Sequence, residues 1–575
     1  MFPSFIELKK NCKKVDESLP KARLVIMGDC ATQHLATAIK GYGVNEGLCL
    51  DILDTDYNQI LPQIIDPNSE TYSFNPDYVL IAMCTEKLYE AYAETKIEDR
   101  SSFCDNKIKE IEGYLTGLRA NSSAKILQLN FPEADDRAYG NFGAIYESSF
   151  ISQLRKLNGA LAKLAREIGN VYIIDASYIQ NCMGREAFHD EKIYYAAKMP
   201  FSTEALPRIA ALVIQEIKAL RGQIKKCLVL DLDNTLWGGV VGDDGLNGIQ
   251  IGELGIGHAF WSFQLWLKEL TKRGIILAVC SKNDEDKAKE PFEKHPEMVL
   301  RLTDIAMFVA NWEDKASNIR QIQNTLNIGM DSMVFIDDNP FERDLVSSMI
   351  PEITVPQMPS DPALYVSYLQ SLNLFETTSA SEQDKDRTNQ YREQANRANL
   401  MKQFASYDEY LENLGMVGKA KAFDEFSYPR IAQLSQRSNQ FNLRTVRYSE
   451  EDIKNIANND SYVTRYFTLE DKLGDHGLIS VLIMEKRDDA LFIESLLMSC
   501  RVLKRGMEEF IFNAIIDAAR ENGVSKVIGE YIKTPKNSMV EHLYENMGFT
   551  NTGDNIYTMN VADYSYKKNY INKQS

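Results

Sequence analysis

The chain has 575 residues, of which 44% are hydrophobic and 25% charged, so it is globular in composition and too long for one core; we expect three or four domains. A formal net charge of −18 argues against nucleic acid as a partner, because phosphates would be repelled. Nine scattered cysteines, no signal-peptide core and no membrane-length apolar run predict free thiols and a cytoplasmic protein without a membrane partner.

Residues 1–222 form the first expected domain, of the α/β class. Short apolar runs rich in branched side chains predict buried strands. They lie at Leu24–Gly28, Tyr78–Met83, Lys125–Leu129 and Val171–Ile174.

Polar residues in this domain resemble the SGNH-type hydrolases. Gly28–Cys30, Asn130 and His189 stand where such enzymes carry their motifs, but Cys30 replaces the nucleophilic serine and Glu186 replaces an aspartate. The resemblance implies a degenerate relative, which we expect to serve in docking. Two alternatives stay open: a thiol hydrolase that uses Cys30 and His189, or a small buried cysteine and a structural histidine.

The second expected domain spans residues 223–374. Strands are predicted at Cys227–Leu230, Gly274–Cys280 and Met333–Ile336, with helices such as His258–Lys272 and Lys315–Leu326 between them. Alternating strands and helices indicate a parallel sheet with crossover helices.

Four motifs follow in order along this domain. They are DLDNT at Asp231–Thr235, CSKN at Cys280–Asn283, NWEDK at Asn311–Lys315 and FIDDNP at Phe335–Pro340. Each follows a strand, and the carboxyl ends of parallel strands are where α/β folds bind ligands. Any one motif alone would be read as an ordinary turn. The four together predict a Mg²⁺-dependent phosphoryl-transfer site.

The chemistry assigns a role to each motif. Asp231 is the candidate nucleophile, and Asp233 is placed to protonate the leaving oxygen and then to activate water. Ser281 and Lys315 would hold the phosphate oxygens, and Thr235 would fix the loop that orients Asp233.

A Mg²⁺ ion is the expected cofactor, because an anionic nucleophile cannot approach a phosphate dianion without charge neutralisation. The expected metal ligands are Asp231, the backbone carbonyl of Asp233, and Asp338 or Asp337.

This motif set resembles that of the haloacid dehalogenase (HAD) phosphatase superfamily. Asp231, Asp233, Ser281, Lys315 and the Asp337/Asp338 pair match its four motifs. The intervals between motifs hold a Gly-rich flap at Trp237–Gly248 and a helix, which is too little for a cap domain. The resemblance therefore implies an open site that admits a group carried on another protein.

A polar segment at residues 375–415 is expected to be a linker with helices, one of them near Tyr391–Phe404. Residues 416–575 resemble GNAT-type acyltransferases. A strand at Leu491–Met498 leads through a loop at Arg501–Gly506 into a helix at Glu508–Arg520.

The GNAT-like loop departs from the family pattern at one position. Glu508 stands where the second loop glycine is usual, and its carboxylate would repel the pyrophosphate of CoA. A phosphopantetheine phosphodiester carries less charge and could still bind there. Asn537 and Tyr544–Phe549 match the C-terminal GNAT pattern.

Cys500 is a candidate acyl-carrying nucleophile. Arg501 and a nearby helix N-terminus are expected to favour its thiolate, and Asp475 or His476 could supply a base. The alternative is a buried cysteine at a strand end. Cys280 is a rival thiol, but its predicted inward position in a strand favours core packing.

Basic residues gather in the C-terminal third, and we expect either a solvated face or a surface for an acidic carrier protein. They are Arg430, Arg437, Arg444, Arg447, Arg501, Lys504 and Arg505.

Four segments together resemble the FkbH family of glyceryl transferase/phosphatases: DLDNTLWGG, which begins at Asp231, NWEDK at Asn311–Lys315, residues 430–447, and MSCRVLKRGME at residues 498–508. The resemblance implies that 1,3-bisphosphoglycerate is dephosphorylated and its glyceryl group is passed through a cysteine to the phosphopantetheine thiol of an acyl carrier protein. It also implies that Arg501, Arg505, Gly506 and Asn537 contact the acyl or phosphopantetheine group.

Three alternatives to this function stay open. The chain could be a Mg²⁺-dependent phosphatase of a small phosphorylated metabolite, a loader of a different acyl group, or a non-enzymatic docking scaffold. The complete set of four motifs disfavours the scaffold.

Overall fold

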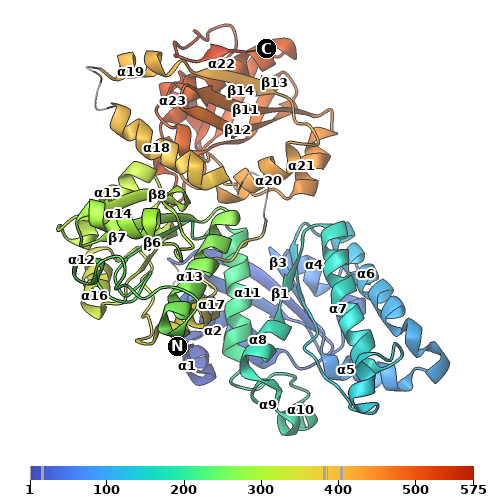
Figure 1. Ribbon diagram of the computed structural model, residues 1–575. Coiled ribbons are helices and arrows are strands. Elements are labelled where there is room, and N and C mark those ends of the chain that lie inside the picture. The colour runs from blue at the N-terminus through green and yellow to red at the C-terminus, as the bar shows by residue number, and fades with distance from the viewer. Residues whose placement is uncertain are drawn as a thin grey trace. The chain divides into compact units, whose positions relative to one another are not determined.

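The computed structural model describes residues 2–14, 18–379, 384, 386–401, 404 and 406–574. The chain forms two compact units, Met1–Lys218 and Ala219–Ser575, and each is described by itself. Both units mix helices with β-sheets (Figure 1), so the expected multidomain α/β fold is confirmed. Within the described ranges, no helix is both long enough and apolar enough to cross a membrane.

The first unit is built on a parallel five-stranded sheet with the order β2-β1-β3-β4-β5. The strands are β1 (Lys21–Gly28), β2 (Cys49–Asp54), β3 (Tyr78–Ala82), β4 (Lys125–Leu129) and β5 (Val171–Ile174). Four were predicted from apolar runs. The fifth, β2, was missed because its sequence CLDILD carries two aspartates and its side chains are mostly half-exposed at the sheet edge.

The first unit also contains helices, several of which share a buried apolar cluster with that sheet. The longer ones are α2 (Gln33–Asn45), α5 (Thr85–Glu94), α6 (Phe103–Asn121), α7 (Phe150–Ile168), α8 (Ala176–Met183) and α11 (Leu206–Leu220). The shorter ones are α1 (Phe5–Asn11), α3 (Ile60–Ile65), α4 (Glu70–Phe74), α9 (Arg185–Phe188) and α10 (Glu191–Ala197). Side chains of α6 and α7 form a buried cluster with those of β3 and β4.

The second unit begins with a parallel four-stranded sheet of order β8-β7-β6-β9. Its strands are β6 (Cys227–Leu230), β7 (Ile276–Ser281), β8 (Ile305–Ala310) and β9 (Met333–Ile336). The helices are α12 (Val241–Asp244), α13 (Gly255–Lys272), α14 (Glu285–Lys294), α15 (Lys315–Leu326), α16 (Pro340–Met349) and α17 (Tyr365–Leu372). The largest elements between β6 and β7 are the helices α12 and α13. This agrees with the short intervals between the motifs.

The strands of this sheet are buried on both faces, because side chains alternate along each strand. Leu228 and Leu230 pack with α13 and α17 on one face, whereas Cys227 and Val229 pack with α15 and α16 on the other. This explains why the strands read as continuous apolar runs.

The rest of the second unit contains an eight-stranded sheet of order β15-β16-β14-β13-β12-β11-β10-β17. Its strands are β10 (Val417–Lys421), β11 (Tyr462–Asp471), β12 (Gly474–Arg487), β13 (Ala490–Met498), β14 (Lys526–Glu530), β15 (Thr550–Gly553), β16 (Ile556–Asn560) and β17 (Asn572–Lys573). The long neighbours β11, β12 and β13 are antiparallel, and β13 pairs in parallel with β14. The crossover between β13 and β14 is α22 (Met507–Glu521), as expected for a GNAT-like fold.

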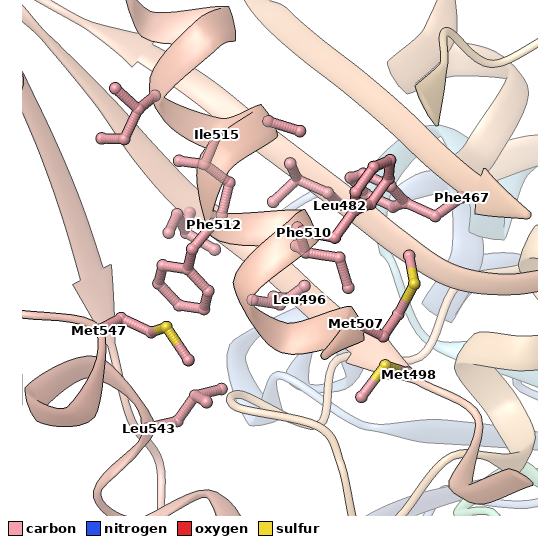
Figure 2. Packing of buried hydrophobic residues seen from close by; sticks show 14 of the residues in the cluster. Phe467, Leu482, Leu496, Met498, Met507, Phe510, Phe512, Ile515, Leu543 and Met547 are labelled. Atoms are coloured by element: carbon pink, nitrogen blue, oxygen red, sulfur yellow. The ribbon is translucent and has the colours of Figure 1, made fainter. Parts of the chain in front are cut away.

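Helix α22 is held against this sheet by a large apolar cluster. Figure 2 shows Phe510 of α22 beside Phe467 and Leu482 of the sheet, and the rings of Phe467 and Phe510 lie edge to face at 6.3 Å. Such aromatic pairs add to the hydrophobic free energy of folding. The packing fixes the loop before α22, which contains Cys500 and Arg501.

The segment between the two sheets contains α18 (Arg387–Met401) and α19 (Tyr407–Leu414), followed after β10 by α20 (Tyr428–Arg437) and α21 (Glu450–Ala457); a last short helix is α23 (Leu543–Asn546). Helix α18 contacts β7, β8 and α15 of the four-stranded sheet region and also β12 (Figure 1). Parts of the expected linker, residues 380–383, 385, 402, 403 and 405, lie outside the described residues. The four-part division with limits at 222, 374 and 415 stays a proposal.

Candidate functional site: a carboxylate cluster and a cysteine

Three carboxylates meet at the carboxyl edge of the four-stranded sheet. Asp231 follows β6, and Asp337 and Asp338 follow the neighbouring strand β9. Their carboxylate oxygens lie within 4.8 Å of one another, close enough to share one cation. Among the described residues, the sequence-predicted metal ligands Asp231, Asp337 and Asp338 are therefore brought together.

Lys315 supplies the positive charge between these acids. Its Nζ donates to Asp231 Oδ1 at 2.7 Å and to Asp337 Oδ2 at 2.6 Å. Burial opposes the charge on the ammonium, but the two carboxylates outweigh it and raise the pKa of Lys315. Lys315 is the first residue of α15, where Asp314 caps the helix by accepting a hydrogen bond from Ser317 N.

The pKa values of these acids are raised, and a bound cation would stabilise their ionised forms. Burial raises the pKa of Asp231, and Lys315 offsets this only in part. Burial and then the charge of Asp231 raise the pKa of Asp337 to about 6. Clustered buried carboxylates with raised pKa values are what a divalent-cation site looks like without its ion, so the donor set fits Mg²⁺.

Asp233 lies beside the cluster and is fixed by three donors. Its Oδ1 accepts from Trp237 Nε1 and from Val241 N, each at 3.0 Å, and its Oδ2 accepts from Asn283 Nδ2 at 3.1 Å. Its carboxylate is not part of the three-acid cluster, consistent with its expected metal contact through the backbone carbonyl. The flap residues Trp237 and Val241 thus position the candidate acid/base group.

Thr235 and Ser281 complete the set. Thr235 is fully buried, and its Oγ1 accepts from Asp338 N at 3.1 Å, so it joins the β6 loop to the β9 loop. Ser281 is the last residue of β7, the strand adjacent to β6. Cys280, one residue earlier, is fully buried in the core, as the sequence suggested.

Two contributors to this site were missed from the sequence alone. Asn283 stands within the CSKN motif, two residues after Ser281, so its position was a usable signal. Arg343 on α16 donates from Nη1 to the backbone carbonyls of Asp337 and Asp338, at 2.8 and 2.7 Å. No motif in the sequence marked Arg343, because its hydrogen bonds to these carbonyls form only when α16 packs against the loop that precedes it.

The thiol of Cys500 does not have the lowered pKa that the sequence predicted. Burial raises the pKa of its thiol, and Lys226 and Arg501 only partly offset this. The expected dipole effect is absent because α22 begins at Met507, and Cys500 instead starts a short 3₁₀ turn at Cys500–Val502. Its Sγ donates to Gln440 Oε1 at 3.1 Å, so the predicted ready thiolate is wrong for the protein in this state.

The two residues predicted to act as a base for Cys500, His476 and Asp475, form hydrogen bonds with other groups. His476 Nε2 lies 2.9 Å from Asp471 Oδ2, and Arg505 Nη1 lies 3.3 Å from the same oxygen. Arg397 adds a two-point contact to Asp471. These buried side chains form a structural ion network, and Asp475 uses its carboxylate to accept from Gly477 N at 2.7 Å.

The predicted acyl-binding residues separate into two groups. Arg501 is buried, with Nε donating to Ser499 Oγ at 3.2 Å, and it faces a cavity together with Cys500. Arg505 belongs to the Asp471 network, and Gly506 takes a left-handed φ of 80° as the N-cap of α22. Asn537 is fully buried and donates to the carbonyls of Asn442 and Ile532, so ligand contact through Asn537 lacks an exposed side chain.

Glu508 lies in the first turn of α22, at the loop where the sequence suggested that its carboxylate would repel pyrophosphate. Its Oε1 accepts from the backbone N–H of Lys504 at 3.3 Å, and burial raises the pKa of the carboxyl. The carboxylate therefore lies at the α22 N-terminus in place of a ligand oxygen.

Of the seven basic residues only Lys504 is exposed, so they do not together form a solvated face or an exposed docking surface. Arg430, Arg501 and Arg505 are nearly buried, and Arg444 pairs with Glu494 and Glu530. The pattern in the sequence could not show this, because burial of an arginine depends on distant partners.

In the first unit, Cys30 and His189 are both buried. Cys30 Sγ donates to the carbonyl of Ala82 at 3.5 Å, and hydrogen bonding with Cys84 together with burial raises the pKa of its thiol. His189 Nδ1 instead lies 2.9 Å from the carbonyl of Pro200 and 3.4 Å from Glu86 Oε1. These contacts favour the structural reading of both residues over a thiol hydrolase.

Comparisons with known proteins agree with this geometry. The family model described as "FkbH, N-terminal domain" matches residues 23–218. The crystal structure of the N-terminal part of the protein BF1531 from Bacteroides fragilis, containing a phosphatase domain complexed with Mg, is 47% identical, with a TM-score of 0.63; the match covers 66% of this chain and all of that one.

Weaker likenesses involve acetyltransferases. The ribosomal-protein-S18-alanine N-acetyltransferase from Escherichia coli is 16% identical, with a TM-score of 0.20 over 25% of this chain and 94% of its own. The spermidine N-acetyltransferase from Vibrio cholerae is 12% identical, with a TM-score of 0.20 over 26% of this chain and 98% of its own. A search of curated proteins gives no match. On the family match and the 47% identical relative, the chain belongs to the FkbH family and is an enzyme with a phosphatase-type domain.

Proposed function

We propose that this protein removes phosphate from a phosphorylated three-carbon acyl donor, 1,3-bisphosphoglycerate, and transfers the glyceryl group through Cys500 to the phosphopantetheine thiol of an acyl carrier protein. The observation that carries the proposal is the cluster of Asp231, Asp337 and Asp338 around Lys315, in the same compact unit as Cys500. A phosphate site and an acyl acceptor in one unit are what coupled chemistry requires.

The phosphatase half of the reaction starts at Asp231. Its carboxylate oxygen attacks the phosphorus atom of the phosphate ester at C3, and the bond from that phosphorus to the C3 oxygen breaks, so the acyl phosphate at C1 is kept for the transfer step. Asp233, held by Trp237, Val241 and Asn283, gives a proton to the leaving oxygen. It then takes a proton from the water that hydrolyses the aspartyl-phosphate. Ser281 and Lys315 bind the non-bridging oxygens.

Mg²⁺ is the metal we assign to the three carboxylates, supported by the Mg in the 47% identical relative from Bacteroides fragilis. When bound, it supplies charge neutralisation between the carboxylate nucleophile and the phosphate. Asp231, Asp337, Asp338 and the backbone carbonyl of Asp233 would hold it.

The acyl half uses the thiol of Cys500. The thiolate attacks the acyl carbon, a sulfur–carbon bond forms, and the bond from that carbon to the phosphate oxygen breaks. The phosphopantetheine thiolate then attacks the thioester and releases Cys500. Glu508 supports a carrier rather than CoA as acceptor, because it occupies the loop where pyrophosphate would bind.

Exposed aromatic residues beside the phosphate site support access by a carried group. Trp312 is 72% exposed in the loop after β8, and Phe341 is 67% exposed after β9. These two strands are the outer strands of the sheet, so the segments that carry the two residues follow the strands on either side of β7 and β6. Large exposed apolar side chains at a site favour binding of a partner.

A plain Mg²⁺-dependent phosphatase is the second candidate function. The raised pKa of the Cys500 thiol favours it, because a buried protonated thiol is a weak nucleophile. The proposed transfer therefore requires the thiol to lose its proton when the donor binds.

Intact-mass measurement of an acyl carrier protein separates the two functions. The carrier with its phosphopantetheine arm is incubated with this protein, Mg²⁺ and freshly generated 1,3-bisphosphoglycerate, and released phosphate is followed in parallel. We expect glyceryl mass on the carrier, none with Cys500→Ala, and unchanged carrier loading with Cys280→Val, the matched core control. Phosphate release without carrier mass in the wild type would support the plain phosphatase. Carrier loading by Cys500→Ala would contradict the relay.

A further inference from the structure

A cavity of about 460 Å³ lies inside the second unit, between the end of the four-stranded sheet region and the GNAT-like region. Its wall includes Lys226 just before β6, Asn327 after α15, and Gln440 and Cys500 from the GNAT-like part. The two regions are joined here by Asn327 Nδ2, which donates to the carbonyl of Cys500 at 2.7 Å, and by Lys226 Nζ, which donates to the carbonyl of Arg437 at 2.8 Å.

Cations dominate the wall of this cavity. Six basic and two acidic side chains line it: Lys226, Arg387, Arg430, Arg437, Arg501, Lys536, Asp331 and Glu352. Asp331 pairs with Lys536, and Asp384 behind the wall pairs with Arg387 and Arg437.

The other three cations, Lys226, Arg430 and Arg501, form no ion pair with an acid among the residues that the structure describes. Arg430 donates to Gln433, and its Nε has no hydrogen-bond partner although the side chain is only 7% exposed. Arg501 donates to Gln390 and Ser499, which are both neutral. Buried charges are normally paired, so this excess of positive charge implies a missing anion.

The pKa values of these three side chains agree with a missing anion. Burial, with repulsion from neighbouring arginines, lowers the pKa of Arg501 to about 10 and lowers that of Arg430. Burial lowers the pKa of Lys226 to about 8, and repulsion from Arg387 and Arg437 adds to this. A bound anion would stabilise all three charged forms at once.

We infer that this cavity is the binding site for the polyanionic acyl phosphate itself, with Lys226, Arg430 and Arg501 on its phosphate groups and Cys500 facing its acyl carbon. The inference rests on the proposed function and adds to it a donor site distinct from the carboxylate cluster. It also explains why arginines spread over more than a hundred residues of sequence converge on one cysteine.

The step in this site balances without a further reactant. The Cys500 sulfur forms a bond to the acyl carbon, and the carbon–oxygen bond to the leaving phosphate breaks. The oxygen keeps the electron pair, and the released phosphate takes the thiol proton and leaves as the dianion. Arginine side chains suit this task because their planar groups bind phosphate in two-point geometry.

Protection of Cys500 from alkylation tests the site. The full chain carrying Asp231→Asn, in chelator, is treated with iodoacetamide in the presence of 2,3-bisphosphoglycerate, an unreactive polyanion. Peptide mapping follows Cys500, with the exposed Cys182 as the internal control. We expect saturable slowing at Cys500 and none at Cys182.

Matched variants make the test specific. Arg430→Gln should weaken the protection by at least about tenfold, whereas Arg430→Lys should give intermediate protection, because the charge is retained and the two-point geometry is lost. Arg465→Gln, whose arginine pairs with Glu521 at the protein surface, should behave as the parent. Thermal melting checks that each variant is folded. Absence of protection in the folded parent, or equal protection in Arg430→Gln, would overturn the inference.

Two further arms separate this inference from the proposed function. If 4′-phosphopantetheine protects Cys500 and 2,3-bisphosphoglycerate does not, the cavity takes the carrier's arm and the donor assignment is wrong. If 2,3-bisphosphoglycerate protects Cys500 while the carrier never gains mass, the anion site stands and the transfer to the carrier fails.

Discussion

The side-chain amide of Asn327 donates to the backbone carbonyl of Cys500 at 2.7 Å. Asn327 is the C-cap of α15, the helix that begins with Lys315 of the carboxylate cluster. One helix therefore has the proposed phosphate site at its first residue and the candidate acyl-carrying cysteine beside its C-cap. This contact offers a physical link between phosphate release and acyl transfer.

Replacement of Asn327 by glycine should weaken that link. Asn327 has a φ of 52°, and glycine adopts this left-handed conformation without strain, so the variant removes the amide and keeps the backbone. Loss of one hydrogen bond is worth about 1 kcal/mol. We expect carrier loading to fall about fivefold while phosphate release stays within about twofold, by parallel assays.

Asn75→Gly is the control for this variant. Asn75 also has a left-handed φ, of 50°, and caps a helix in the first unit. It should leave both activities unchanged. Equal loss of phosphate release and carrier loading in Asn327→Gly would contradict a coupling role.

Asp231→Asn should abolish phosphate release. Asparagine keeps the size of the side chain but cannot form an aspartyl-phosphate, so we expect a loss of at least about three orders of magnitude in kcat. Steady-state phosphate release on the donor is the measurement. The variant should fold, since the amide oxygen can still accept from Lys315.

Asp344→Asn, on α16 away from the cluster, serves as the matched control for that loss. It changes the same charge without touching the three acids and should retain activity. Near wild-type turnover by Asp231→Asn would refute the assignment of the nucleophile.

Cys30→Ala should leave both phosphate release and carrier loading largely intact. The thiol is buried, its pKa is raised, and His189 is bound to the Pro200 carbonyl and Glu86. Loss of one buried sulfur would cost about 1 kcal/mol of stability. Loss of carrier loading, with melting temperature and phosphate release unchanged, would instead make Cys30 a chemical residue.

The buried His476 predicts how stability depends on pH. Burial, with the charges of Arg505 and Arg397, lowers its pKa from the ordinary 6.5 to about 4. Between these values the unfolded chain binds a proton that the folded chain does not, so stability falls as pH decreases from 6.5 to 4. The loss should be at most about 3 kcal/mol.

His476→Gln should flatten that dependence, since glutamine can donate to Asp471 and does not titrate. Thermal unfolding at several values of pH between 4 and 7 is the measurement. His542→Gln is the control, because His542 is exposed and pairs with Glu545 at the surface. The same slope in His476→Gln as in the wild type would show that another group causes the pH dependence.

Local sequence determined several strands and marked the residues of the candidate phosphate site. Lys125–Leu129, Cys227–Leu230 and Met333–Ile336 are strands with the bounds that their apolar runs predict. A buried parallel strand needs a continuous apolar run, and a turn that follows it carries the polar residues. Asp231, Ser281, Lys315 and Asp338 were therefore identifiable before any tertiary contact was known.

Only the tertiary structure determined the pKa of the Cys500 thiol and the position of the arginines around one cavity. Its neighbour Arg501 and the helix α22 suggested a thiolate, but α22 begins only at Met507, and burial outweighs Arg501 because desolvation depends on packing from distant parts of the chain. Arg430 and Arg501, 71 positions apart in sequence, line one cavity with Lys226. No pattern in the local sequence predicts this convergence. Periodicity and motif spacing describe residues that are close along the chain. The electrostatic potential at a buried group depends instead on the residues that tertiary packing brings beside it.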